Sequence, residues 1–167
     1  MKSARFWIDE LKLLPHPEGG YYRETYRSRE IASKKSLPPR YSSFRSFSTN
    51  IVYLLESSSF SAFHRLLSDE MWHFYEGSPA YIHMLHPSGV FRTQKLGRDL
   101  NKNESLQILV PKGIWFAVEV AEASSYMLAG CTVSPGFDFD DLIMGEAERL
   151  VKLNPEHGKL IRRLCIK

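Results

Sequence analysis

The sequence has few cysteines and no arrangement of them that suggests disulfides or a thiolate metal site. Its 167 residues include only two, Cys131 and Cys165, and they do not form a Cys-x-x-Cys pair. We therefore expect both thiols to be reduced and packed, as in a cytosolic protein.

Long apolar runs and clustered basic residues are also missing. No apolar stretch approaches the length of a membrane span, and Asp9, Glu10 and Lys12 interrupt the apolar centre that a signal peptide would need. The net charge is only +3, and the basic residues are scattered apart from one Lys-Lys and one Arg-Arg pair. A nucleic-acid groove needs a clustered basic face. The sequence predicts a cytoplasmic protein that binds neither membranes nor nucleic acid and takes a small molecule as its partner.

Internal repeats and low-complexity tracts are not visible, so the length indicates one domain over residues 1–167. Short segments rich in β-branched and aromatic residues alternate with turn signals, which is typical of consecutive antiparallel strands in an all-β sandwich or barrel. We expect the barrel to occupy residues 20–135. The expected strands cover residues 21–28, 50–55, 60–66, 71–75, 80–85, 90–96, 106–110, 114–120 and 126–133.

Helical patterns are confined to the two ends. Residues 3–14 carry apolar side chains at helical spacing behind Ser3, a suitable N-cap, and Pro15 ends the segment. Residues 140–165 predict further helices, with Asp140 or Asp141 capping the first of them. The intervening loop over residues 31–47 is expected to fold over a pocket mouth or to reach a neighbouring subunit.

Two titratable residues define the candidate site. Strand alternation places His64 on the same face as Ala62 and Leu66, so its imidazole points inward. Glu70 opens the next strand, where a buried carboxylate needs a donor, a metal ion or a raised pKa. A core histidine satisfied by its neighbours is the alternative for His64 alone, but both residues together favour a functional pocket. His73 falls on the face opposite Glu70 and joins the pocket only through a bulge.

Other polar segments are explained without function. The segment His16-Pro17-Glu18-Gly19-Gly20 is predicted to be a tight connection in which the glycines adopt positive φ. His83 and His86 have no carboxylate partner nearby in the sequence, so we expect them to be packed or exposed. The acids of residues 138–141 fit capping and solvated positions better than a metal site.

Two cupin motifs and three subfamily segments carry a family resemblance. His64, Glu70 and Gly77 resemble the first conserved motif of the cupin superfamily, and residues 110–116 resemble its second motif, Pro-x-Gly-x-x-His. Residues 16–22, the string Glu70-Met71-Trp72-His73 and residues 134–139 are similar to the DUF985 subfamily of cupins. The resemblance covers nearly the whole chain. It implies a double-stranded β-helix, the cupin jelly-roll barrel, flanked by a short N-terminal helix and C-terminal helices.

The resemblance also implies a metal site, of which the sequence keeps only part. The family's second histidine falls on Leu66, and the histidine of the second motif falls on Phe116. His64 and Glu70 are retained, and His73 is the candidate third ligand. Catalytic zinc and iron sites commonly have three protein ligands, so the cofactor is either one divalent ion held by these three residues or none.

Aromatic and basic side chains supply candidate ligand contacts. Trp115 and Phe116 follow the Pro-x-Gly turn and offer an apolar wall for a sugar ring or a base, with Trp72 facing them from another strand. We place Tyr53 in the same wall. Arg23 is a candidate cation for an anionic substrate, although a strand arginine commonly forms a surface salt bridge.

Three functions follow from these residues. The first is a metal-independent sugar epimerase or isomerase, which similar cupins achieve with a histidine base; here His64 is the base, Glu70 orients or protonates it and Trp115 holds the ring. The second is a metal-dependent oxygenase or isomerase using His64, Glu70 and His73. The third is a non-catalytic binding or sensing protein. Cupin barrels often pair through N-terminal strands, where this chain has three tyrosines, so we also expect a homodimer.

Overall fold

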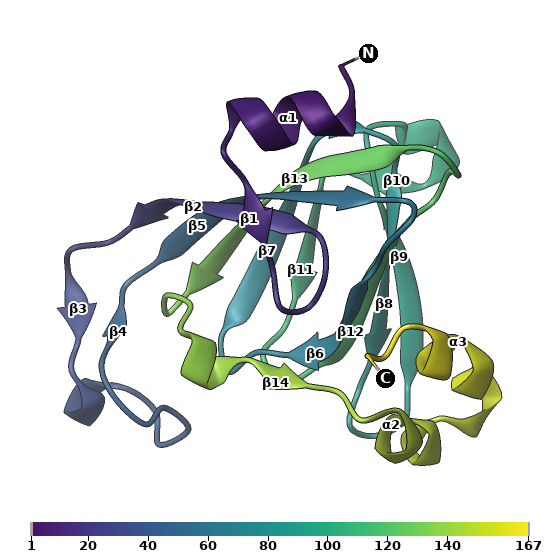
Figure 1. Cartoon of the computed structure of the whole chain (residues 1–167). Coiled ribbons are helices and arrows are strands. Elements are labelled where there is room, and N and C mark those ends of the chain that lie inside the picture. The colour runs from purple at the N-terminus through teal and green to yellow at the C-terminus, as the bar shows by residue number, and fades with distance from the viewer. Residues whose placement is uncertain (1, 167) are drawn as a thin grey trace.

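The computed structural model describes residues 2–166, which form two six-stranded sheets and one small hairpin (Figure 1). The first sheet contains, in spatial order, β1 (Leu14–Pro15), β2 (Tyr21–Arg27), β5 (Thr49–Glu56), β13 (Tyr126–Ser134), β7 (Asp69–Gly77) and β11 (Gln107–Val110). The second contains β10 (Glu104–Ser105), β9 (Phe91–Leu96), β8 (Ala80–Leu85), β12 (Trp115–Val120), β6 (Ser61–Arg65) and β14 (Ile143–Met144). The hairpin pairs β3 (Ile31–Ala32) with β4 (Arg45–Ser46).

The core lies between the two sheets. Buried side chains from both meet there, among them Tyr53 and Trp72 from the first sheet and Ile82 and Phe116 from the second. Each such side chain contributes about 1.5–3 kcal/mol on burial. All nine expected strands are present, with ends within two residues of those predicted. The sequence signal is reliable here because turn residues separate the segments that are rich in β-branched and aromatic side chains.

The pairing of β6 and β7 differs from the expectation. They were predicted to be neighbouring antiparallel strands, but β6 pairs with β12 and β14, and β7 pairs with β13 and β11. The short link at residues 66–68 carries the chain from one sheet to the other. His64 and Glu70 therefore belong to opposing walls of the core.

Short helices pack on part of the outer face of each sheet (Figure 1). Helix α1 (Ala4–Glu10) begins as predicted, because the Ser3 hydroxyl accepts a hydrogen bond from the Phe6 amide at 3.1 Å. It ends at Glu10, four residues earlier than predicted, and Leu14–Pro15 instead pair with β2. Helices α2 (Ala147–Leu153) and α3 (Gly158–Arg163) pack on the second sheet. No helix within residues 2–166 is long and apolar enough to cross a membrane.

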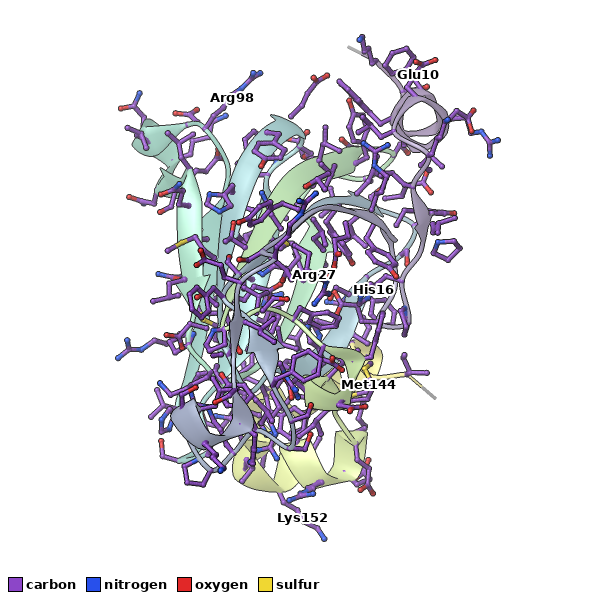
Figure 2. The ribbon with its side chains drawn as sticks, turned by 90° about the vertical axis from the view of Figure 1, so that its left-hand side faces the viewer. Glu10, His16, Arg27, Arg98, Met144 and Lys152 are labelled. Atoms are coloured by element: carbon purple, nitrogen blue, oxygen red, sulfur yellow. The ribbon has the colours of Figure 1, made fainter. Side chains whose placement is uncertain are left out.

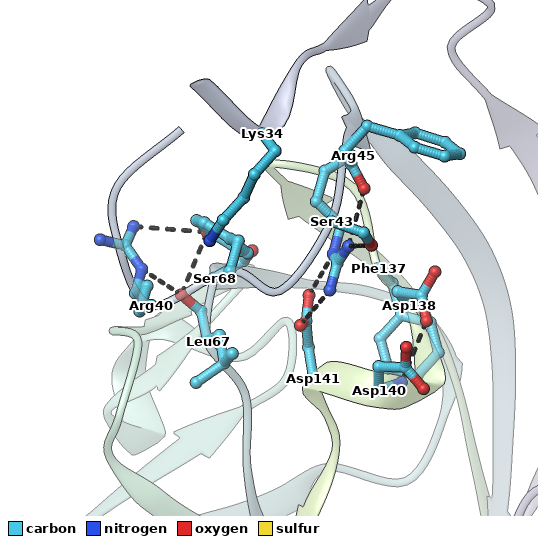
Figure 3. Close-up of polar contacts among 12 residues, drawn as sticks. Lys34, Arg40, Ser43, Arg45, Leu67, Ser68, Phe137, Asp138, Asp140 and Asp141 are labelled. Carbon is cyan, nitrogen blue, oxygen red and sulfur yellow. Dashed lines mark hydrogen bonds and ion pairs between the residues drawn. The ribbon is translucent and has the colours of Figure 1, made fainter. Parts of the chain in front are cut away.

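The loop over residues 31–47 is anchored by a buried ion pair (Figure 3). Arg45 donates to both carboxylate oxygens of Asp141, at 2.7 and 2.6 Å, and to the Ser43 hydroxyl. Hydrogen bonding to Asp141 raises the pKa of Arg45. This corrects the expected N-cap, since Glu146 occupies the position before α2 and Asp141 binds the loop instead.

Candidate functional site

A cavity of about 280 Å³ lies between the sheets. Its buried lining includes Glu18, Tyr53, His64, Glu70 and Cys131. Its rim carries a charged pair and a tyrosine from β2 and aromatic rings from two loops. Figure 2 labels His16 and Arg27, which both line the cavity. The rim residues are His16, Tyr22, Glu24, Arg27, Phe137 and Phe139.

An irregularity in β6 sets the position of His64. The register against β12 shifts between Phe116 and Val118, which lie opposite His64 and Ser61 respectively. Because Phe116 and Val118 share one face of β12, Ser61 and His64 both face the interior, which strict alternation would not allow. Nδ1 of His64 contacts the Ala62 carbonyl oxygen at 2.7 Å. A carbonyl only accepts, so Nδ1 carries the hydrogen and neutral His64 has its lone pair on Nε2.

A turn places Glu18 against that lone pair. The tight connection expected at residues 16–20 is present, and Gly19 has φ +116°, with no room for a side chain because a Cβ would overlap the Phe60 carbonyl oxygen. The Tyr53 hydroxyl donates to the Gly19 carbonyl at 2.7 Å. The turn also carries Glu18 into the cavity, which sequence reasoning missed. The sequence signal for Glu18 was an acid beside two glycines, within the segment 16–22 that is similar to the DUF985 subfamily.

Glu18 and His64 form a buried pair. Glu18 Oε2 lies 3.0 Å from His64 Nε2, and Glu18 Oε1 accepts from the Ser61 hydroxyl at 3.0 Å. Burial raises the pKa of Glu18 and lowers the pKa of His64. Both shifts favour the neutral form of the side chain concerned. A carboxyl and an imidazole thus face each other across 3.0 Å at the cavity wall.

Glu70 faces the cavity from the opposite sheet. Its side chain is buried, with the residue 7% exposed, and within residues 2–166 its Oε2 has no hydrogen-bond partner. Burial raises its pKa to about 7 and Glu18 raises it further, whereas His64 and hydrogen bonds from Trp72 and Cys131 lower it. A buried oxygen without a donor is costly. Glu70 Oε2 is therefore open to a donor from a ligand.

The remaining predicted site residues are only partly brought together. Tyr53 lines the cavity. Phe116 packs beside it, with its ring 4.1 Å from that of His64, and Trp72 packs edge-on against Tyr53 in the core. Trp115 does not reach the cavity, because it lies on the other face of β12 beneath α2 and α3. Its expected role as a ring-holding wall is therefore corrected.

Arg23 and His73 also lie away from the cavity. Arg23 is exposed and does not line it. A register shift between Glu24 and Tyr26 brings Arg27 to the cavity side instead, so the cation of β2 is Arg27. His73 lies outside the cavity, bonded to Thr132 at 3.0 Å. Regular alternation thus gave the correct face for His73. It gave the wrong face for Arg27, because of the bulge in β2.

The residues present do not fit the metal site that the cupin resemblance implies. Leu66 and Phe116 stand where the family has imidazoles, and both ring nitrogens of His64 are engaged by Ala62 and Glu18. The candidate third ligand, His73, does not converge with the other two. Within residues 2–166, no three His, Cys, Asp or Glu side chains are grouped so that they could hold an ion.

A second buried histidine pairs with an acid outside the cavity. His83 Nε2 lies 3.0 Å from Glu119 Oε1, and His83 Nδ1 contacts Thr93 Oγ1 at 2.9 Å. Arg163 donates two hydrogen bonds to the same Glu119, at 2.6 and 2.9 Å. The carboxylate partner that was not visible near His83 in the sequence thus comes from β12. This chain of contacts ties α3 to the second sheet.

Residues 5–145 match the family described as "Cupin superfamily (DUF985)". The chain belongs to this cupin family. An uncharacterized yeast protein, YML079W of Saccharomyces cerevisiae, is 31% identical over 166 residues, which cover 92% of this chain and 82% of the yeast protein. The crystal structure of protein SO0799 from Shewanella oneidensis is similar to the cupin described here, with a TM-score of 0.87 and 38% identity over 99% of each chain.

Oxalate decarboxylase from Bacillus subtilis is a more distant structural neighbour of this cupin. The TM-score is 0.54 and the identity 13%, over 90% of this chain and 36% of the decarboxylase. At that identity the likeness concerns the fold alone. The expected cupin jelly roll is thereby confirmed, whereas the chemistry has to be argued from the side chains of the cavity.

Proposed function

We propose that this cupin binds a small polar molecule in the cavity and catalyses a metal-independent proton transfer on it, as an epimerase or isomerase does. The contact of 3.0 Å between His64 Nε2 and Glu18 Oε2 carries the proposal. A carboxyl and an imidazole at this distance can share one proton, and moving it from one group to the other leaves the net charge of the pair unchanged.

In this proposal Glu18, His64 and Glu70 have different roles. When the shared proton moves to His64, Glu18 becomes a carboxylate that can take a proton from a carbon next to a carbonyl group. The Ser61 hydroxyl fixes one carboxylate oxygen, and the Nε2–H of His64 stabilises the other. Glu18 then returns the proton to the substrate. Glu70, with its unpartnered oxygen, holds the substrate from the facing sheet.

Solvent deuterium exchange tests the proposal. Keto sugars, amino sugars and nucleotide sugars are incubated with the protein in D₂O, and deuterium in the recovered compounds is measured by mass spectrometry. Exchange that is lost in Glu18→Gln and greatly reduced in His64→Ala supports proton transfer. His83→Ala is the matched control, because it breaks another buried His–Glu pair that lies outside the cavity. If no compound exchanges, catalysis is rejected.

A non-catalytic binding protein is the second candidate. It is favoured by the engagement of both His64 nitrogens, which leaves this ring without a free lone pair for a substrate. Binding of a small molecule without deuterium exchange would identify this function.

We also propose a homodimer formed through the side of β2 and the β3–β4 hairpin. Large apolar side chains are exposed there, with Phe44 at 58% and Phe47 at 51%, and exposed apolar groupings mark interfaces. Light scattering coupled to size-exclusion chromatography tests this. A dimer that dissociates in the Phe44→Ser, Phe47→Ser double variant supports the proposal, with Leu100→Ser as an exposed control elsewhere; a monomeric wild type rejects it.

A further inference from the structure

The cavity holds acids without a free cation to balance them. Glu18, Glu24 and Glu70 line it. Arg27 is the one Arg or Lys among the described lining residues, and it is already engaged. Its guanidinium donates to both oxygens of Glu24, at 3.0 and 2.7 Å, and to the Phe137 carbonyl at 3.1 Å. An anionic ligand would therefore enter beside carboxyl groups, and the described lining residues offer it no free arginine or lysine.

Glu70 is the lining acid with an unpartnered oxygen. Its Oε2 has no partner within residues 2–166 although the carboxyl is buried. The other two acids are bonded, Glu18 to His64 and Ser61 and Glu24 to Arg27. Hydrogen bonds from a charged donor to a carboxylate are stronger than those from a neutral donor. A ligand ammonium group would supply both the missing hydrogen bond and the missing positive charge.

The rim of the cavity consists largely of aromatic rings. The His16 ring lies 4.6 Å from that of Tyr22 and 6.0 Å from that of Phe139, and the Phe137 and Phe139 rings are 5.0 Å apart. The faces of Tyr and Phe rings attract organic cations through their quadrupoles. The rim and the buried carboxyl thus favour the same charge on the ligand.

We infer that the ligand of this cavity is a small organic cation whose protonated amine docks against Glu70. The inference rests on the proposal that the cavity binds a small polar molecule, and it names the chemical class of that molecule. The cavity volume of about 280 Å³ is at the lower end for ligand sites, which fits a compound of one ring.

Two sets of size-matched probes test the inference. One set is benzylamine, benzyl alcohol and benzoate; the other is glucosamine, glucose and glucuronate. Each is titrated into the wild-type protein by calorimetry at constant pH and ionic strength. We expect the amine to bind at least tenfold more tightly than the neutral probe in at least one set, and neither carboxylate to bind. Anion binding as tight as that of the amine, or no binding by either amine, would overturn the inference.

Charge and shape are separated by variants. Glu70→Gln keeps the shape of the side chain and removes its charge, so amine binding should weaken by about 30-fold or more while binding of the neutral probe is unchanged. Glu10→Gln is the control, since Glu10 is an exposed acid on α1, far from His16 and Arg27 in Figure 2. Equal loss of amine and neutral binding in Glu70→Gln would refute the ammonium contact. Amine binding without deuterium exchange would reject the proposed catalysis and leave this inference standing.

Discussion

Asp141→Asn is predicted to be among the most destabilising conservative substitutions in this chain. The Asp141 and Arg45 side chains are only 3% and 1% exposed and share two hydrogen bonds of 2.6 and 2.7 Å. Removing one partner leaves a buried, uncompensated guanidinium, which costs about 3–5 kcal/mol. For a chain of this size, that corresponds to a decrease in Tm of about 6–20 °C.

Urea denaturation followed by circular dichroism measures the change in the free energy of unfolding. Asp140→Asn is the matched control, because Asp140 is the exposed neighbour of Asp141 (Figure 3) and should change stability by less than about 0.5 kcal/mol. The double variant Arg45→Met, Asp141→Leu should recover much of the loss, since apolar replacements of buried ion pairs are often neutral. Equal stability of Asp141→Asn and Asp140→Asn would refute the reasoning.

Three further predictions concern the cavity. The folded-state pKa of Glu70 is raised to about 7, so the fold loses stability as pH rises from about 4.5 to 7. The free energy of unfolding of Glu70→Gln should therefore exceed that of the wild type by up to about 3 kcal/mol at pH 8 and equal it at pH 4. Urea denaturation at both pH values measures the difference. Gly19→Ala should lower the free energy of unfolding by about 2 kcal/mol or more, because φ at Gly19 is +116° and a Cβ there would overlap the Phe60 carbonyl. Gly113→Ala, with φ +78° and open space around it, should cost about 1 kcal/mol. Similar decreases in Tm for the two variants would contradict this. The purified protein should contain no stoichiometric divalent ion by plasma mass spectrometry, and a chelator should leave its Tm unchanged; one ion per chain that is lost in His64→Ala would disprove the fit argument.

The sequence predicted strands well and their partners poorly. Strand existence depends on local alternation and turn residues, which are visible for segments such as β8, found at the predicted bounds. Pairing depends on the path of the chain between sheets, so the assignment of β6 and β7 to different sheets was not visible. Two register shifts then changed which side chains face inward. They turned Ser61 toward Glu18 and brought Arg27 to the cavity, where regular alternation had favoured neither.

The candidate site was predicted in part for the same reason. His64 and Glu70 stood out because a polar residue on an apolar strand has few explanations. Glu18 did not stand out, because a turn rich in glycine already explains itself as a turn. The carboxyl of Glu18 reaches His64 only through the three-dimensional path of the chain, in which Gly19 packs against Phe60.

The link at residues 66–68 affects how the distance between His64 and Glu70 is determined. His64 and Glu70 are six positions apart in the chain, yet they are mounted on different walls. The gap between them is set by the thickness of the packed layer, and not by the short tether. A larger or smaller side chain in place of Phe116, whose ring contacts His64, should therefore increase or decrease the distance between His64 and Glu70 without altering any group that contacts the ligand.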